Sequence, residues 1–394
     1  MPDIKLRLNK DMLVLSTPVL SALARLGIDV EHDVEFTLLL EPDTLEDAYK
    51  LEFIAGAQCL VAATASVTPA RLARAGMEDR AAEVVSAALG AVRAQVPQHV
   101  LAEIGPCGLP LDASSKASLR ENLDQYARAG RLFAQEEFDA FFLNGFSTCA
   151  DLKCALMGLR KVSDAPVFAS VDVAADGTLR SGRGTLEEAM GIMEDLGADV
   201  AGFSTCAPQE AAVDLARRAA NATALPLLAQ LEVRERNARQ QGPTPENPYY
   251  VPDAMVAAVD ALRAAGVQFL RAVGDATPAY SGALVATTMG LDAVVRESAA
   301  GEGEGGAGAG AAGAASGAGS GGDGSAPHES TAPDAAPAAS SSAVSPAASD
   351  PAASAGAIED ELADFIARAR ERVAAALGDN LAIVEADGPR IEGR

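Results

Sequence analysis

Short apolar runs alternate with longer amphipathic stretches along residues 1–298. Eight of the runs have the length and composition of buried strands: 12–15, 59–62, 100–104, 141–143, 167–173, 200–203, 227–231 and 269–273. Stretches with helical spacing of apolar residues lie between them, for example 118–135, 151–160, 186–196 and 253–265. This alternation predicts an α/β fold, a (βα)8 TIM barrel of parallel strands, with a doubly wound open sheet as the alternative.

The composition changes abruptly after residue 298. Gly, Ala, Ser and Pro dominate residues 299–356, which contain almost no large apolar side chain. Such a segment cannot bury enough apolar surface to offset its ordering entropy, so we expect a disordered linker. Residues 357–394 form a C-terminal segment in which 358–377 show the spacing of an amphipathic helix. This helix could dock on the barrel or on a partner.

The charge and the cysteine content limit the possible partners and the compartment. The net charge of −24 repels phosphate backbones and anionic lipid surfaces, which argues against nucleic acid and membrane as partners. The N-terminus lacks the apolar core of a signal peptide, and no apolar run is long enough to span a bilayer. Five cysteines scattered through apolar segments are typical of reduced thiols rather than of a disulfide framework. We therefore expect a cytoplasmic protein.

In a barrel of this kind, the active site is built at the carboxyl ends of the strands. Those positions place Glu103, Asp172, Glu232 and Asp275 in one acidic mouth. Clustered carboxylates can supply a general base, bind an amine or hold a cation, because they raise one another's pKa. Carboxylates at barrel rims also cap the helices that follow, and the sequence leaves both roles open.

Cys206 is the candidate reactive or metal-binding thiol at the mouth, because it directly follows the sixth predicted strand. A thiol there could line the pocket, bind zinc or stay buried and inert. The chain has three histidines, His32, His99 and His328, and none falls at a strand end facing the mouth. A Ser-His-Asp triad therefore cannot be assembled. The GPCG segment at 105–108 lacks the features of a phosphate loop and predicts a tight turn.

Several segments together resemble the homocysteine S-methyltransferase family, which includes the homocysteine-binding barrel of cobalamin-dependent methionine synthase. The resemblance covers about residues 12–295 and is carried by IAGAQCLVAAT, AEIGPCGLPL, LNGFSTCADLKCALMGLRKV, GADVAGFSTCAP and NPYYVPDAMVAAVDALRAAGVQFLRAVGDATP. It implies a zinc ion held by three cysteine thiolates, one in an NC motif and two in a GGCCGT motif, that activates the homocysteine thiol. Cys206 matches the first ligand, whereas Val273 and Gly274 occupy the other two positions.

Other pocket motifs of the family are also altered. STPVLSA at 16–22 replaces the DG(A/G)xGT turn, and VAATA at 61–65 retains only Thr64 of a threonine-rich signature. Asn144 stands where the family has the glutamate that receives the substrate amine. The zinc and substrate site that the resemblance implies is thus degenerate.

Three functional hypotheses follow. The first is methyl transfer to a thiol or related acceptor, with the donor a corrinoid, a folate or another methylated small molecule, and a corrinoid protein as a possible partner. Its predicted substrate-binding residues are Thr64, Glu103, Asn144, Asp172 and Asp275, its metal residue is Cys206, and no catalytic residue is assigned. The second is a non-catalytic barrel that binds a ligand or a partner protein through the helix 358–377. The third is an enzyme of unrelated chemistry that uses the acidic rim with a hard cation such as magnesium.

Overall fold

The computed structural model describes residues 3–30, 32–235 and 240–295. The predicted linker at 299–356 and the C-terminal segment at 357–394 lie outside the described residues. No helix within the described ranges is both long enough and apolar enough to cross a bilayer.

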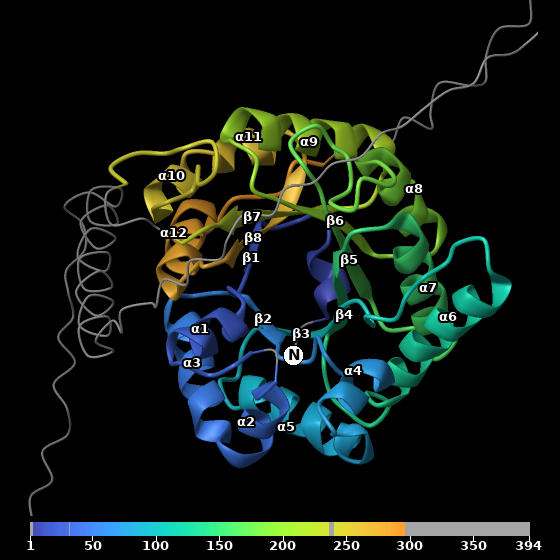
Figure 1. The fold of residues 1–394 in the computed structure, drawn as a ribbon. Coiled ribbons are helices and arrows are strands. Elements are labelled where there is room, and N and C mark those ends of the chain that lie inside the picture. Colours follow the sequence, from blue (N-terminus) through green and yellow to red (C-terminus); the bar gives the residue numbers. More distant parts are fainter. Residues whose placement is uncertain (1–2, 31, 236–239, 296–394) are drawn as a thin grey trace, which may run out of the picture. The chain divides into compact units, whose positions relative to one another are not determined.

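The eight strands form a closed parallel barrel in sequence order, as Figure 1 shows. Their bounds are β1 (Leu13–Leu15), β2 (Cys59–Ala62), β3 (His99–Ile104), β4 (Ala140–Phe146), β5 (Val167–Asp172), β6 (Val200–Thr205), β7 (Leu227–Val233) and β8 (Val267–Gly274). All eight predicted strands are confirmed, and pairing of β1 with β8 excludes the open sheet.

The helices surround the barrel on its outside (Figure 1). They are α1 (Val19–Arg25), α2 (Val34–Leu40), α3 (Pro42–Ile54), α4 (Pro69–Arg74), α5 (Ala81–Arg93), α6 (Lys116–Arg131), α7 (Cys149–Arg160), α8 (Leu186–Asp195), α9 (Gln209–Ala222), α10 (Pro252–Val256), α11 (Val259–Ala264) and α12 (Pro278–Thr288), with 3-10 turns η1 (Ile4–Arg7) and η2 (Glu78–Arg80). The prediction of one helix over 253–265 is wrong. Two short helices occur there, and the carbonyl of Ala257 between them accepts a hydrogen bond of 3.1 Å from the Gln209 side chain.

Two apolar layers hold the barrel together. Side chains alternate in and out along each strand, so one set fills the interior and the other packs against the helices. The interior set includes Leu13, Cys59, Leu101, Phe142 and Phe269, all fully buried. The outer layer, between strands and helices, is larger and consists mainly of Ala, Val and Leu, which agrees with the low aromatic content of 4%.

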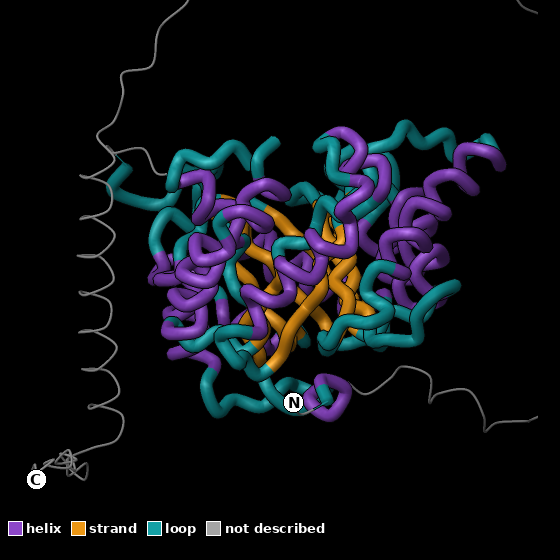
Figure 2. Tube along the Cα trace, turned by 90° about the horizontal axis from the view of Figure 1, so that it is seen from below, coloured by secondary structure: helices purple, strands orange, loops and turns teal. Residues whose placement is uncertain are grey.

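The N-terminal segment closes the end of the barrel at which the strands begin. Ile4 of η1 packs into the interior cluster, and Figure 2 shows this segment at one end of the barrel. The buried side chain of Gln268, near the start of β8, donates hydrogen bonds to the carbonyls of Arg7 (2.7 Å) and Asp11 (2.9 Å). His99 begins β3 at this same end, as predicted, away from the mouth. Any ligand cavity inside the barrel therefore opens at the other end.

Local sequence signals set where helices start and stop around that open end. Thr148 and Thr185 cap α7 and α8, because their hydroxyls accept hydrogen bonds from the backbone of Asp151 (3.1 Å) and Glu188 (3.3 Å). Gly266 ends the preceding helix with φ of +96°, a conformation that favours glycine, and leads directly into β8. These signals fix the segments that carry the site residues.

Candidate functional site

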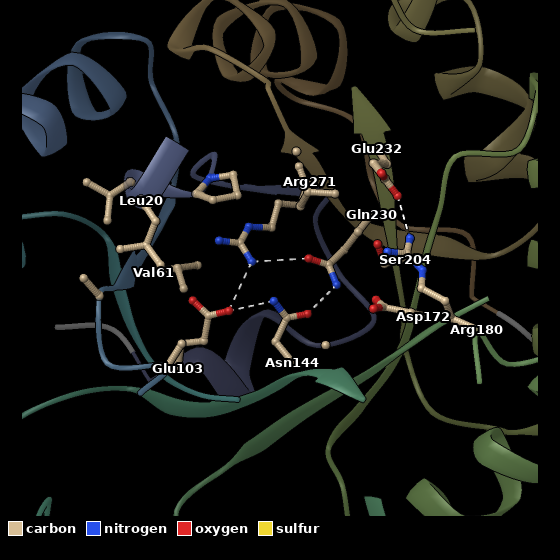
Figure 3. A pocket seen from close by; sticks show the side chains of 17 residues that line it. Leu20, Val61, Glu103, Asn144, Asp172, Arg180, Ser204, Gln230, Glu232 and Arg271 are labelled. Carbon is tan, nitrogen blue, oxygen red and sulfur yellow. Dashed lines mark hydrogen bonds and ion pairs between the residues drawn. The ribbon is translucent and has the colours of Figure 1, made fainter. Parts of the chain in front are cut away.

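A cavity of about 320 Å³ opens at the carboxyl ends of the strands. Seventeen residues line it (Figure 3). Its polar lining residues are Glu103, Asn144, Asp172, Arg180, Ser204, Gln230, Glu232 and Arg271. Apolar side chains, among them Leu20 and Val61, form the opposite side in the same view. The cavity thus has one charged wall and one apolar wall.

Four side chains from β3, β4, β7 and β8 form a polar ring at the centre of the cavity floor (Figure 3). Arg271 Nη1 donates to Gln230 Oε1 (3.3 Å), Gln230 Nε2 donates to Asn144 Oδ1 (2.8 Å), and Asn144 Nδ2 donates to Glu103 Oε1 (2.6 Å). An ion pair of 3.9 Å between Arg271 Nη1 and Glu103 Oε1 closes the ring. Each member depends on the next for a partner, so the ring fixes the orientation of both amides.

Arg271 is the buried cation of this polar ring. The residue is 2% exposed, its Nε donates to the Ser16 carbonyl (2.9 Å), and its guanidinium stands 5.3 Å from the centre of the Phe142 ring. Burial lowers its pKa, although the negative charges of Glu103 and Glu52 act in the opposite direction. A buried guanidinium without such partners would be strongly destabilising.

Glu52 of α3 is a second buried carboxyl close enough to interact with Arg271. Burial raises the pKa of Glu52, an effect that hydrogen bonds from Ser281 (2.6 Å) and Thr17 partly oppose. Both carboxyls act on Arg271, and the effect of Glu103 is larger than that of Glu52.

Asp172, Arg180 and Glu232 form a charged cluster on the other side of the polar ring (Figure 3). Arg180 Nη2 donates to Glu232 Oε2 at 2.6 Å, and the Arg180 backbone N–H donates to the Asp172 backbone carbonyl at 2.8 Å. Burial raises the pKa of Asp172, the nearby Arg180 opposes this rise, and Glu232 adds to it. A carboxylate with a raised pKa that lines a cavity is a candidate general base.

The backbone of β4 is irregular where Asn144 enters the polar ring. The pairing register with β5 shifts between Leu143 and Phe146, and Gly145 adopts φ of +81°, which favours glycine. Such bulges redirect side chains next to functional sites. Here the irregularity accompanies an Asn144 side chain that reaches both Glu103 and Gln230.

The structure brings some of the predicted site residues together and separates others. Glu103, Asn144 and Asp172 line the cavity, whereas Thr64 and Asp275 do not. Thr64 is fully buried, and its hydroxyl donates to the Glu103 carbonyl (2.7 Å), which ties β2 to β3. The Asp275 backbone N–H donates to the Val233 carbonyl (2.9 Å), and its side chain acts electrostatically on Arg25. Substrate contact by these five residues stays a prediction.

Two arginines of the cavity, Arg271 and Arg180, were missed by the sequence reasoning. The sequence does contain a signal for Arg271. This residue follows Phe269 by two positions on a buried strand, so both side chains point to the same face, the barrel interior. Arg180 lies in a loop, where strand alternation gives no information about direction.

Comparison with known proteins gives a family for this barrel. A model described as homocysteine S-methyltransferase matches residues 15–274. The chain belongs to this family. Among solved structures, the homocysteine methyltransferase MmuM from Escherichia coli is similar in its metallated, oxidized and apo forms, with TM-scores of 0.58, 0.57 and 0.54. Each match has 16% sequence identity and covers 70% of this chain and 96% of that chain, which shows a shared fold. A comparison with curated proteins found no match.

The zinc site implied by the homocysteine S-methyltransferase pattern does not fit the residues present. Cys206 is half-buried and does not line the cavity, and its Sγ accepts a hydrogen bond from Arg234 Nη2 at 3.2 Å. Val273 has no ligating atom. Gly274 has φ of +72°, and a Cβ there would collide with the Val233 carbonyl oxygen. Within the described ranges, no group of three His, Cys, Asp or Glu side chains could hold a metal ion.

We expect the purified, reduced protein to contain far less than one zinc ion per chain. Restoring the two missing thiols by the double substitution Val273→Cys and Gly274→Cys should not create a stoichiometric site, because position 274 has no room for a side chain. Elemental analysis after dialysis measures this directly, with Cys206→Ala as the matched control. One tightly bound zinc per wild-type chain that is lost in Cys206→Ala would contradict the expectation.

Proposed function

We propose that this barrel transfers a methyl group to a thiol or related nucleophile of a small acceptor bound in the mouth cavity. This proposal rests mainly on Asp172, a half-buried carboxyl that lines a cavity together with two arginines and whose pKa is raised by partial burial. Family membership supports methyl transfer as the reaction class. A titratable group placed in such a cavity favours this function over a non-catalytic barrel.

The proposed step needs a proton acceptor and a positioned nucleophile. The Asp172 carboxylate takes the proton of the acceptor thiol, the sulfur forms a bond to the methyl carbon, and the bond between that carbon and the donor's leaving atom breaks with its electron pair. No metal takes part in this step. The polar ring and Arg180 fix the acceptor before the donor approaches, which lowers the entropic part of the barrier.

The magnesium hypothesis has little support from the same geometry. Glu103 and Glu232 are engaged by arginines, and a divalent cation would have to displace those guanidinium groups. A corrinoid or folate donor, a corrinoid protein partner and a cytoplasmic location stay predictions.

The test is a methyl-transfer assay with homocysteine as the first acceptor. The full chain is incubated with methylcobalamin, a methylated folate or a methylsulfonium donor, and methylated product is measured by mass spectrometry with and without a chelator. We expect product with at least one donor, at a rate that the chelator does not change. Complete absence of product with homocysteine and with other small thiols would refute the proposal, and loss of product in chelator would refute the metal-free step. The Arg218→Gln variant serves as a control, because Arg218 is half-buried in an ion pair with Glu187 and does not line the cavity.

A further inference from the structure

The guanidinium of Arg271 has hydrogen-bonding capacity that the protein leaves unused. Its Nε donates to Ser16 and its Nη1 to Gln230, whereas Nη2 makes no hydrogen bond to any residue in the described part of the chain. Figure 3 shows this second nitrogen directed away from the polar ring, toward the side of Val61. The side chain of Arg271 is 1% exposed, and it lines the mouth cavity. A buried cationic donor of this kind favours a bound acceptor atom.

The charges around Arg271 favour an anionic acceptor atom over a neutral one. Among the described residues, its one carboxylate partner within 4 Å is Glu103, which stands at the long distance of 3.9 Å and also accepts a shorter hydrogen bond from Asn144. Glu52 acts on Arg271 less strongly than Glu103 does. Arg271 is thus incompletely compensated at a buried position that is shielded from bulk water, where a carboxylate would form strong charge-assisted hydrogen bonds.

The position of Arg271 in the sequence also helps to explain why the zinc ion implied by the family pattern does not fit this site. Arg271 and Ala272 fall on the two glycines of the GGCCGT pattern that the sequence resembles, directly before Val273 and Gly274. A fixed positive charge therefore stands next to the positions that would otherwise ligate a cation. This charge can bind an anion, and it would repel a metal ion.

We propose that Arg271 anchors the carboxylate of the acceptor through its unused Nη2 donor. The inference rests on the proposed function. The carboxylate contributes more to binding than the amine does. Glu103, which could bind an amine, already accepts a hydrogen bond from Asn144 and pairs with Arg271, whereas Arg271 Nη2 has no hydrogen-bond partner among the described residues. The carbon chain of the acceptor packs on the apolar wall that includes Leu20 and Val61.

The proposal is tested by the binding of three thiols to the wild-type protein, measured by calorimetry. Homocysteine carries both a carboxylate and an amine, 4-mercaptobutyrate carries only the carboxylate, and 3-aminopropanethiol carries only the amine. We expect 4-mercaptobutyrate to bind within about threefold of homocysteine and 3-aminopropanethiol to bind about 10- to 100-fold more weakly, the range of a charged hydrogen bond. Equal or tighter binding of 3-aminopropanethiol overturns the proposal, as does the absence of binding by both carboxylates.

Variants of Arg271 test whether this side chain causes the preference for thiols that carry a carboxylate. Arg271→Gln should reduce the affinity for both carboxylates to that for 3-aminopropanethiol, and Arg271→Lys should restore part of the difference, because lysine keeps the charge but not the fork of donors. Arg218→Gln is the matched control. Thermal unfolding shows which variants are folded, and the comparison of ligands on the wild-type protein needs no variant. An unchanged preference for carboxylates in folded Arg271→Gln overturns the assignment.

The two proposals can fail separately. If the carboxylates bind as expected and no donor yields methylated product, the proposed function fails and the carboxylate site stands. If homocysteine and 3-aminopropanethiol are methylated with equal kcat/KM, the function stands and the role of Arg271 is wrong.

Discussion

Replacement of Asp172 by asparagine is expected to lower the rate of methyl transfer by about 10²- to 10⁴-fold, the usual contribution of a general base. Asparagine keeps the size and polarity of the side chain but cannot accept the thiol proton. The variant should fold normally, because Asp172 lies at the edge of the cavity at the end of β5. Steady-state kinetics should show the loss in kcat with little change in KM.

The pH dependence of the wild-type rate gives an independent check. The ionised form of Asp172 is the active base, so activity should be low below its raised pKa and should increase as the pH rises through that value. Asp172→Asn should lack this rise. The matched control is Asp176→Asn, because Asp176 lies in the following loop and accepts hydrogen bonds from Thr178 outside the cavity. An Asp172→Asn variant with full activity would show that another group takes the proton.

Replacement of Glu103 by alanine is expected to lower the free energy of unfolding by about 3–5 kcal/mol, the cost of leaving a buried charge without its partner. The substitution removes the carboxylate nearest Arg271 and also the acceptor of the Asn144 side chain. Urea unfolding at neutral pH measures the change. The exposed pair of Arg80 and Glu83 supplies the control, since Glu83→Ala should cost less than about 1 kcal/mol.

A double variant shows how much of this loss in the free energy of unfolding comes from the unpaired charge and how much from lost packing. In Glu103→Leu with Arg271→Met, both charges are gone and apolar side chains of similar length fill the space, so most of the lost stability should return. If Glu103→Ala were as stable as the wild type, Glu52 or bound water would have to compensate Arg271. In that case, the polar ring would be less important for stability than its geometry indicates.

Much of the fold follows from local patterns in the sequence. The strands are short apolar runs with a buried pattern, and glycines such as Gly56 and Gly266 end the helices that precede them. These features depend on a few neighbouring residues, which is why the order of elements could be predicted. The single helix expected over 253–265 failed because a side chain from α9, Gln209, binds the carbonyl of Ala257, a contact between distant segments.

The sequence alone also placed Glu103, Asn144 and Asp172 at the mouth, where they line the cavity, since strand ends can be read directly. Only the tertiary structure decided that Arg271, Glu103, Asn144 and Gln230 form one ring and that Thr64 and Asp275 lie outside the cavity. The physical reason is that barrel closure and strand register bring β3, β4, β7 and β8 into contact, and a register shift of one residue would reverse every inward side chain. The strength of a charge in such a site depends on those neighbours and on its burial, which local sequence does not specify.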